Sequence, residues 1–213
     1  MKHMAAQTNE GLIRELKEGG YLRSASVEDA LRSVDRSLFV PEEHRAEAYE
    51  NHALPIGFGQ TISQPLTVAF LLSLLEPKAG DKILDVGMGS GWQTALLAWL
   101  TGEGGIVIGI ERMQELAESA EKNIQKIHTV KKGTIKTVLG DGSKGYSAEA
   151  PYDKIIAAAS GTAIPTGWKE QLKIGGRIVT PVGQQIRVLN KTGPNEFTEQ
   201  NYFGFSFVPL VEQ

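Results

Sequence analysis

The sequence predicts a doubly wound α/β fold in which helices cover both faces of a mostly parallel sheet. Three observations support this prediction. Apolar runs of strand length alternate with helical patterns from residue 83 onward. A glycine-rich loop, Gly87-Met-Gly-Ser-Gly91, joins the first apolar run to a helical segment. The 213 residues suffice for one well-buried domain and are too few for two full ones.

The N-terminal part of the chain is expected to be helical. A first amphipathic helix should end where Gly19 and Gly20 favour a C-terminal cap. A second should begin at Ser26, because Asp29 three residues later completes a pattern like a capping box. A third, more apolar helix should end before Pro77.

Two segments between these helices lack a regular period. Residues 39–41 and then 49–55 mix polar and apolar side chains and are expected to form an ordered loop. Residues 54–65 hold two prolines and two glycines with little charge, so they are too stiff and too apolar for disorder. This second loop either packs against the sheet as a connector or binds a ligand through backbone N–H groups and the hydroxyls of Thr61 and Ser63.

The α/β core is read from the alternation that follows. Strands are expected at 83–86, 106–110, 134–139, 154–159 and 176–182, with helices at 93–100 and 113–127. The β-rich segments 185–190 and 197–210 flank a turn and predict an antiparallel hairpin at one edge of the sheet. We expect residues 1–80 to form the helical region and the loop, and residues 81–213 the core, within one structural domain.

Composition excludes several classes of function. The net charge is −3 and the basic residues are scattered, so we expect neither nucleic acid nor an anionic membrane as a partner. The absence of cysteine rules out disulfides and thiolate catalysis, and no metal site is expected. The N-terminus lacks a signal-peptide pattern and no segment approaches the length of a membrane span, so we expect a cytoplasmic protein. We also expect a monomer.

Three acidic residues stand at the carboxyl ends of successive predicted strands. Asp85 precedes the glycine loop, Glu111 ends the second strand and Asp141 follows the third. Glu111 lies twenty positions past Gly91, where an acid accepts ribose hydroxyls, and Asp141 can receive an adenine amino group. A nucleoside is therefore the expected ligand, although each acid alone also suits a helix cap or a loop.

The glycine loop discriminates among ligands that contain a nucleoside. Trp92 stands where the dinucleotide fingerprint G-x-G-x-x-G has its third glycine, and no Gly-Lys-Ser/Thr of a phosphate-binding loop follows. A nucleoside joined to an amino acid suits the loop better, with Asp85 placed to orient the loop or to reach an ammonium group. This description predicts S-adenosylmethionine, and the remaining alternative is a tight turn without a ligand.

The chain resembles the protein-L-isoaspartate O-methyltransferase family. The glycine loop and Gly140-Asp141 are shared by many methyltransferases, whereas Gly59-Gln-Thr-Ile-Ser-Gln-Pro65 is much more specific. The resemblance runs from about Leu12 to Leu210, and its other segments are Phe39-Val-Pro41, Leu54-Pro-Ile-Gly-Phe58, Asp85-Val-Gly-Met-Gly-Ser-Gly-Trp-Gln93, Ala150-Pro-Tyr-Asp153 and Gln171-Leu-Lys-Ile-Gly-Gly-Arg-Ile-Val-Thr-Pro-Val-Gly183.

This resemblance implies a Rossmann-like methyltransferase fold and a repair activity. Methyl transfer from S-adenosylmethionine to the α-carboxylate of L-isoaspartyl residues would initiate the repair of damaged proteins. The resemblance assigns Ser63 to the active site, and we expect the backbone at Gln60, Thr61 and Ile62 to hold the substrate with it. The expected cofactor contacts are Asp85, Gly87, Met88, Gly89, Glu111, Asp141 and Gly142.

The chemistry needs no catalytic base, because a carboxylate is already ionised at neutral pH. The chain departs from the family pattern at Asn51, where an acid is usual, and at Ala158, near a usual threonine. The family's chain commonly continues beyond the position of Gln213, so weaker closure over the substrate is expected. The alternatives are a cofactor-binding protein with lost or altered acceptor specificity and, less favoured by the acidic composition, a methyltransferase of RNA or small molecules.

Overall fold

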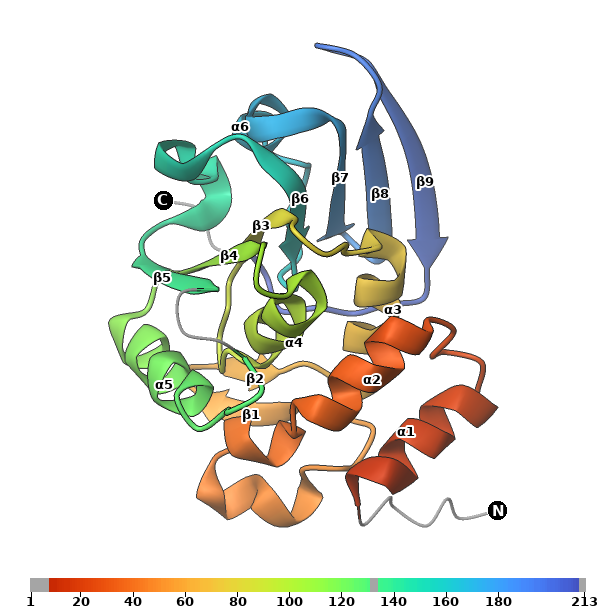
Figure 1. Ribbon diagram of the computed structural model, residues 1–213, viewed down its shortest axis with the longest axis vertical. Helices are drawn as coiled ribbons and strands as arrows, with labels where there is room; N and C mark the ends of the chain where they lie inside the picture. Colours follow the sequence, from red (N-terminus) through yellow and green to blue (C-terminus); the bar gives the residue numbers. More distant parts are fainter. Residues whose placement is uncertain (1–7, 131–133, 211–213) are drawn as a thin grey trace.

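The computed structural model describes residues 8–130 and 134–210 (Figure 1). Its main sheet contains β3 (Lys82–Val86), β4 (Ile106–Glu111), β5 (Ile135–Leu139), β6 (Tyr152–Ala157), β7 (Leu172–Val182), β8 (Gln185–Lys191) and β9 (Phe197–Phe203). The seven strands lie in the order β5-β4-β3-β6-β7-β8-β9. Neighbours from β5 to β7 are parallel, and β8 and β9 are antiparallel to their neighbours. The predicted sheet with one antiparallel edge is confirmed.

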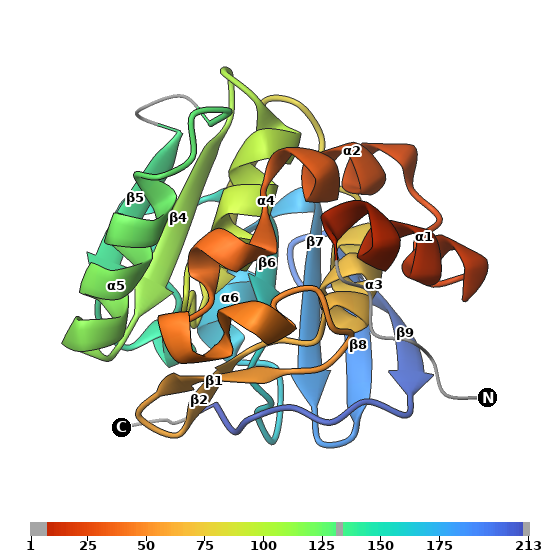
Figure 2. The same cartoon turned by 90° about the horizontal axis from the view of Figure 1, so that it is seen from below.

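The helices cover both faces of this sheet. They are α1 (Asn9–Glu18), α2 (Ala25–Ser33), α3 (Pro65–Leu75), α4 (Trp92–Thr101), α5 (Gln114–Ile124) and α6 (Thr166–Gln171). Strand side chains alternate between the faces: Ile83 packs in the cluster that holds residues of α1 to α4, and Leu84 packs in the cluster of Trp168 on α6. Since α2 packs on α4 and α1 packs on α2, the N-terminal helices form an outer layer on the first face (Figure 2).

The structure corrects the start of the second helix. The predicted stop of α1 is confirmed, because Gly19 caps the helix and donates its N–H to the Glu15 carbonyl at 2.9 Å. In α2, however, the N-cap is Ser24, whose hydroxyl accepts the Val27 N–H at 3.4 Å, and Ser26 lies inside the first turn. Ser24 has the extended backbone that an N-cap requires, with φ −96° and ψ 120°.

The segment expected to be a loop at 54–65 contains a hairpin. Strands β1 (Leu54–Gly57) and β2 (Gln60–Ile62) pair antiparallel and lie on the side of the main sheet toward which β6 and β7 point (Figure 1). The two turn residues, Phe58 and Gly59, have positive φ angles of 54° and 71°. A two-residue hairpin turn of this kind normally uses Asn-Gly or Asp-Gly. Phe58 stands at the first turn position instead, so the sequence lacks the usual hairpin pattern.

Other short elements also depart from the predicted pattern. Two 3₁₀ helices, η1 (Arg36–Phe39) and η2 (Glu42–Glu47), lie beside the ordered loop expected at 39–41 and 49–55, and η1 includes its first residue. Helix α6 has six residues, too few for a recognisable apolar period. The β-rich segment expected over 197–210 forms strand only as far as Phe203. Beyond it the chain crosses to Ser160, which exchanges backbone hydrogen bonds of 2.8 Å with Val208 and Leu210.

Within the two described ranges, no helix combines the length and apolar character needed to cross a bilayer. Residues 1–7, on which the expectation about targeting segments rests, lie outside the described ranges, as do residues 131–133 and 211–213.

Candidate functional site

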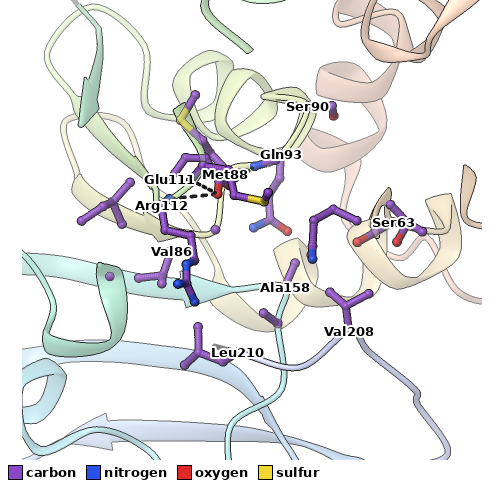
Figure 3. Close-up of a pocket in the computed structure, with 18 of the residues that line it drawn as sticks. Ser63, Val86, Met88, Ser90, Gln93, Glu111, Arg112, Ala158, Val208 and Leu210 are labelled. Carbon is purple, nitrogen blue, oxygen red and sulfur yellow. Dashed lines mark hydrogen bonds between the residues drawn. The ribbon is translucent and has the colours of Figure 1, made fainter. Parts of the chain in front are cut away.

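A cavity of about 560 Å³ opens at the carboxyl ends of β3 and β4, between the glycine loop and the β1–β2 hairpin (Figure 3). Ten residues predicted for the site line it: Gln60, Thr61, Ile62, Ser63, Gly87, Met88, Gly89, Glu111, Asp141 and Gly142. Asp85, the eleventh predicted site residue, does not line the cavity. The wall also includes residues that sequence reasoning did not assign to it, among them Gln93, Arg112 and Val208 to Leu210.

The glycine loop takes a backbone shape that other residues rarely adopt. Gly87, Gly89 and Gly91 have φ angles of 76°, 52° and 87°. A side chain on Gly87 would meet no atom within 4 Å, whereas one on Gly91 would press on Ala120 and Ile124 of α5 at 3.2 Å. Gly87 therefore leaves open space beside the backbone at the cavity, and Gly91 allows α4 and α5 to pack closely.

Glu111 ties the glycine loop to the start of α5. Its Oε1 accepts the backbone N–H groups of Arg112 at 2.9 Å and Met113 at 3.1 Å, and its Oε2 accepts the Gly89 N–H at 3.0 Å. The side chain is 6% exposed and reaches the cavity. A carboxylate offers about four acceptor positions, so Oε2 keeps capacity for a hydrogen bond from a ligand.

Asp85, predicted as a cofactor contact or as a residue that orients the glycine loop, lies behind the cavity wall and does not line the cavity. It is fully buried at the end of β3, where its Oδ1 accepts the Gln93 Nε2–H and its Oδ2 accepts the Thr94 hydroxyl, both at 2.7 Å. Burial raises the pKa of Asp85 to about 6, the two hydrogen bonds oppose the rise, and the negative charge of Glu111 adds to it. Asp85 therefore orients side chains on the first turn of α4.

The stability of the protein should depend on the ionisation of Asp85. The ordinary pKa of 3.8 is below the folded value of about 6, so the native state binds the proton more tightly. We expect Asp85 to make the free energy of unfolding fall between about pH 4 and pH 6, by an amount on the order of 3 kcal/mol, and to add no slope above that range. Urea unfolding of the wild type and Asp85→Asn across pH 4–8 isolates this contribution, and parallel curves would contradict it.

Ser63 lies at the opposite wall from Glu111, between β2 and α3 (Figure 3). Its carbonyl oxygen accepts a hydrogen bond from Arg36 at 3.2 Å. Its hydroxyl has no hydrogen-bond partner in residues 8–130 and 134–210, and the residue lines the cavity. The hydroxyl is therefore available to a ligand.

Arg36 holds the hairpin end from inside the protein, a role that no sequence pattern indicated. Its buried guanidinium donates to the carbonyls of Ala48 at 2.7 Å, His52 at 3.0 Å and Ser63 at 3.2 Å. The same group lies 5.4 Å from the centre of the Trp92 ring. Burial lowers the pKa of Arg36 to about 10, so the group remains charged at neutral pH. Arg36 thus connects the segment bearing Ser63 with the start of α4.

Asn51 caps the start of α3 in this structure. Its Oδ1 accepts the Leu66 N–H in the first turn of α3 at 3.0 Å, and its Nδ2 donates to Glu15 at 3.3 Å. The backbone carbonyl of Asn51 accepts from the side chain of Gln64 at 2.8 Å. Asparagine therefore supplies the acceptor that α3 needs beside Ser63.

Asp141 is both a helix cap and a cavity residue. Its Oδ1 accepts the Ser143 N–H at 2.9 Å and caps the short helix η3 (Gly142–Lys144). A side chain on Gly142 would approach Val86 at 2.6 Å and Ile110 at 2.8 Å. Glycine is therefore required for the loop to close against β3 and β4, which brings Asp141 to the cavity.

The last described residues complete the wall. Val208, Pro209 and Leu210 line the cavity. Val208 and Leu210 lie near Ala158, which presents only a methyl group (Figure 3). Their position depends on the backbone hydrogen bonds to Ser160. Sequence reasoning assigned this segment to a strand and so missed its contribution to the site.

Comparisons with known proteins show the family of the chain. A family model described as protein-L-isoaspartate(D-aspartate) O-methyltransferase matches residues 7–213. A protein-L-isoaspartate O-methyltransferase of Methanopyrus kandleri is 44% identical over 209 residues, which are 96% of this chain and 92% of the relative. A protein of the same name from Aeropyrum pernix is 45% identical over 204 residues, covering 94% and 78% of the two chains.

A solved structure from Plasmodium falciparum, described as a candidate protein-L-isoaspartate O-methyltransferase in complex with S-adenosyl-L-homocysteine, has the same fold. Its TM-score is 0.84 at 22% identity, and the alignment covers 99% of this chain and 100% of that one. The match of the family model over nearly the whole sequence decides the classification. The chain belongs to the protein-L-isoaspartate(D-aspartate) O-methyltransferase family.

Proposed function

We propose that this protein transfers the methyl group of S-adenosylmethionine to the α-carboxylate of L-isoaspartyl residues in damaged proteins. The observation that carries the proposal is the arrangement of a single cavity. The glycine loop and Glu111 form one wall, and Ser63 at the end of the hairpin forms the other. The name of the family to which the chain belongs also describes methyl transfer to isoaspartyl protein.

The residues of the cavity fit this cofactor. A volume of about 560 Å³ lies within the range of small-molecule sites. Gly87 leaves space for a ligand beside the backbone, and Glu111 and Asp141 supply acceptors for the hydroxyl and amino groups of a nucleoside. Gly87, Met88, Gly89 and Gly142 would form the remaining contacts. Bound S-adenosylmethionine supplies a methyl group on a sulfonium centre, which a carboxylate oxygen can attack without a base.

The hairpin side of the cavity would hold the acceptor. The Ser63 hydroxyl, together with those backbone N–H groups of Gln60, Thr61 and Ile62 that the β1–β2 pairing leaves free, would donate to one carboxylate oxygen, and the other oxygen would remain free to react. No lysine or arginine stands in residues 54–65, so no fixed cation there quenches the nucleophile. The hairpin and Leu210 would exclude water, and positioning of this kind lowers a barrier substantially.

The cavity wall also suggests which part of the chain binds the acceptor and which binds the cofactor. We assign acceptor binding to residues 1–80, which contain the hairpin, and cofactor binding to residues 81–213. We also propose that the protein is active as a monomer. Gel filtration combined with an activity measurement on each fraction tests this assignment, and activity confined to a dimer peak would contradict it.

Methyl transfer to a pair of isomeric peptides tests the proposed reaction. One peptide contains L-isoaspartate and the other contains aspartate at the same position. We expect base-labile methyl esters, which release methanol, on the isoaspartyl peptide alone. Equal labelling of both peptides would contradict the proposed specificity. Tight cofactor binding with no transfer would instead favour a protein with lost or altered acceptor specificity.

Replacing Ser63 by alanine should separate catalysis from cofactor binding. We expect kcat/KM for the isoaspartyl peptide to fall by about 10- to 100-fold, because one hydrogen bond to a charged carboxylate is lost. The Kd for S-adenosylhomocysteine should change less than about twofold, because the Ser63 hydroxyl faces the acceptor side. Ser63→Thr keeps the hydroxyl and serves as the control. A loss confined to cofactor affinity would show that Ser63 has no role at the substrate.

A further inference from the structure

A glutamine on the cavity wall has an unused hydrogen-bond acceptor. Gln93 is the second residue of α4, is 7% exposed and lines the cavity between Glu111 and Ser63 (Figure 3). Its Nε2 donates to Asp85 at 2.7 Å. Its Oε1 is buried and has no hydrogen-bond partner within residues 8–130 and 134–210. A buried acceptor without a partner is destabilising, so its presence at the cavity indicates a ligand that donates.

Asp85, which lies behind the cavity wall, sets the orientation of the Gln93 amide. The ionised carboxylate of Asp85 only accepts hydrogen bonds, so the donor end of the Gln93 amide must face it. The Thr94 hydroxyl donates to the second carboxylate oxygen at 2.7 Å, so the Gln93 amide interacts with the first oxygen alone. The planar amide then turns Oε1 away from Asp85, and the Gln93 side chain that bears it lies at the cavity wall (Figure 3).

The negative charge of Asp85 makes Gln93 Oε1 a better acceptor for cationic donors. The carboxylate polarises the hydrogen-bonded amide, so the partial negative charge on Oε1 increases. Gln93 therefore favours a positively charged group with N–H donors, and it disfavours the carboxylate of an acceptor peptide.

Among the groups of S-adenosylmethionine, only one meets this description. The hydroxyl and amino groups of the nucleoside face Glu111 and Asp141 in the proposed arrangement. The sulfonium is positive but has no hydrogen to donate, whereas the α-ammonium is positive and has three. We propose that Gln93, oriented by Asp85, accepts a hydrogen bond from the α-ammonium of the methionine part of the cofactor. This inference rests on the proposed function.

Binding measurements test the proposal without turnover. Titration calorimetry compares S-adenosylhomocysteine with its deamino analogue, in which hydrogen replaces the amino group, on the wild type and on Gln93→Met. Methionine keeps the length and removes the acceptor. We expect the Kd for S-adenosylhomocysteine to rise about tenfold in Gln93→Met, as for one hydrogen bond to a charged group, and the Kd for the analogue to change less than about twofold.

Thr94→Val provides the matched control. It removes the other hydrogen bond to Asp85 from the same helical turn, and Thr94 does not line the cavity. This variant should keep the wild-type preference for S-adenosylhomocysteine over the deamino analogue. A thermal unfolding curve of each variant shows that it is folded before the titration.

Other outcomes would contradict the role of Gln93, the identity of its ligand or the proposed function. Equal weakening of both ligands in Gln93→Met would show that Gln93 only supports the shape of the wall. Unchanged binding of both ligands, with a raised KM for the isoaspartyl peptide, would assign the acceptor to the substrate. A wild-type protein that binds neither ligand would contradict the proposed function itself.

Discussion

Replacing Glu111 by alanine is expected to weaken the binding of S-adenosylhomocysteine by about 100-fold. The carboxylate accepts three backbone N–H groups, from Gly89, Arg112 and Met113, and it faces the cavity. Without it, the glycine loop and the start of α5 lose their common anchor, and the ligand loses a charged acceptor. Hydrogen bonds to charged groups each contribute about 1.5–3 kcal/mol, so the combined loss is large.

Glu115→Ala is the matched control for this prediction. Glu115 also lines the cavity from α5, but no backbone hydrogen bond to its carboxylate occurs among the described residues. We expect its replacement to change the Kd less than about threefold, and Glu111→Gln, which keeps one acceptor oxygen, to give an intermediate Kd. Similar affinities for Glu111→Ala and Glu115→Ala in calorimetry would refute the role of Glu111.

Replacing Arg36 by methionine is expected to lower the free energy of unfolding by about 4 kcal/mol. The guanidinium donates to carbonyls of Ala48, Glu50, His52 and Ser63, and all of these interactions are lost together. Methionine fills part of the volume but donates nothing, so buried carbonyl groups remain without partners. Urea unfolding monitored by tryptophan fluorescence measures the change.

Arg36→Lys separates charge from geometry. Lysine keeps the positive charge but has a single donor centre, so it cannot reach carbonyls spread around a planar guanidinium. We expect it to restore less than half of the lost stability and to leave kcat for the isoaspartyl peptide reduced, because the segment at Ser63 is held less firmly. Full recovery of both quantities would show that the charge alone matters. An unfolding free energy for Arg36→Met within 1 kcal/mol of the wild type would contradict the buried-donor argument.

Patterns that repeat along the sequence predicted most of the fold. Apolar runs such as 83–86 and 106–110 must be buried on both faces, and that requirement alone indicates parallel strands between helices. The same patterns placed Glu111 and Asp141 at carboxyl ends of strands, and both line the cavity. These predictions held because the period of a strand or helix and the position of its end are local properties of the chain.

Short elements and side-chain directions were not predictable in this way. The turn at Phe58-Gly59 has positive φ at both residues but lacks the usual asparagine, so the sequence predicts a loop where the structure has a hairpin. Helix α6 is too short to show a period, and the segment that ends at Leu210 depends on pairing with Ser160. In each case contacts with distant parts of the chain decide the conformation.

By itself, the sequence determined the doubly wound sheet, the shape of the glycine loop and the residue types at the strand ends. Only the tertiary structure decided which of these residues touch the cavity. Asp85 stands beside the glycine loop in sequence, but Gln93 and Thr94, which lie beyond the loop on the first turn of α4, donate to both of its oxygens. The periodicity of a strand or helix follows from neighbouring residues, whereas the partner of a buried polar group is set by packing between elements.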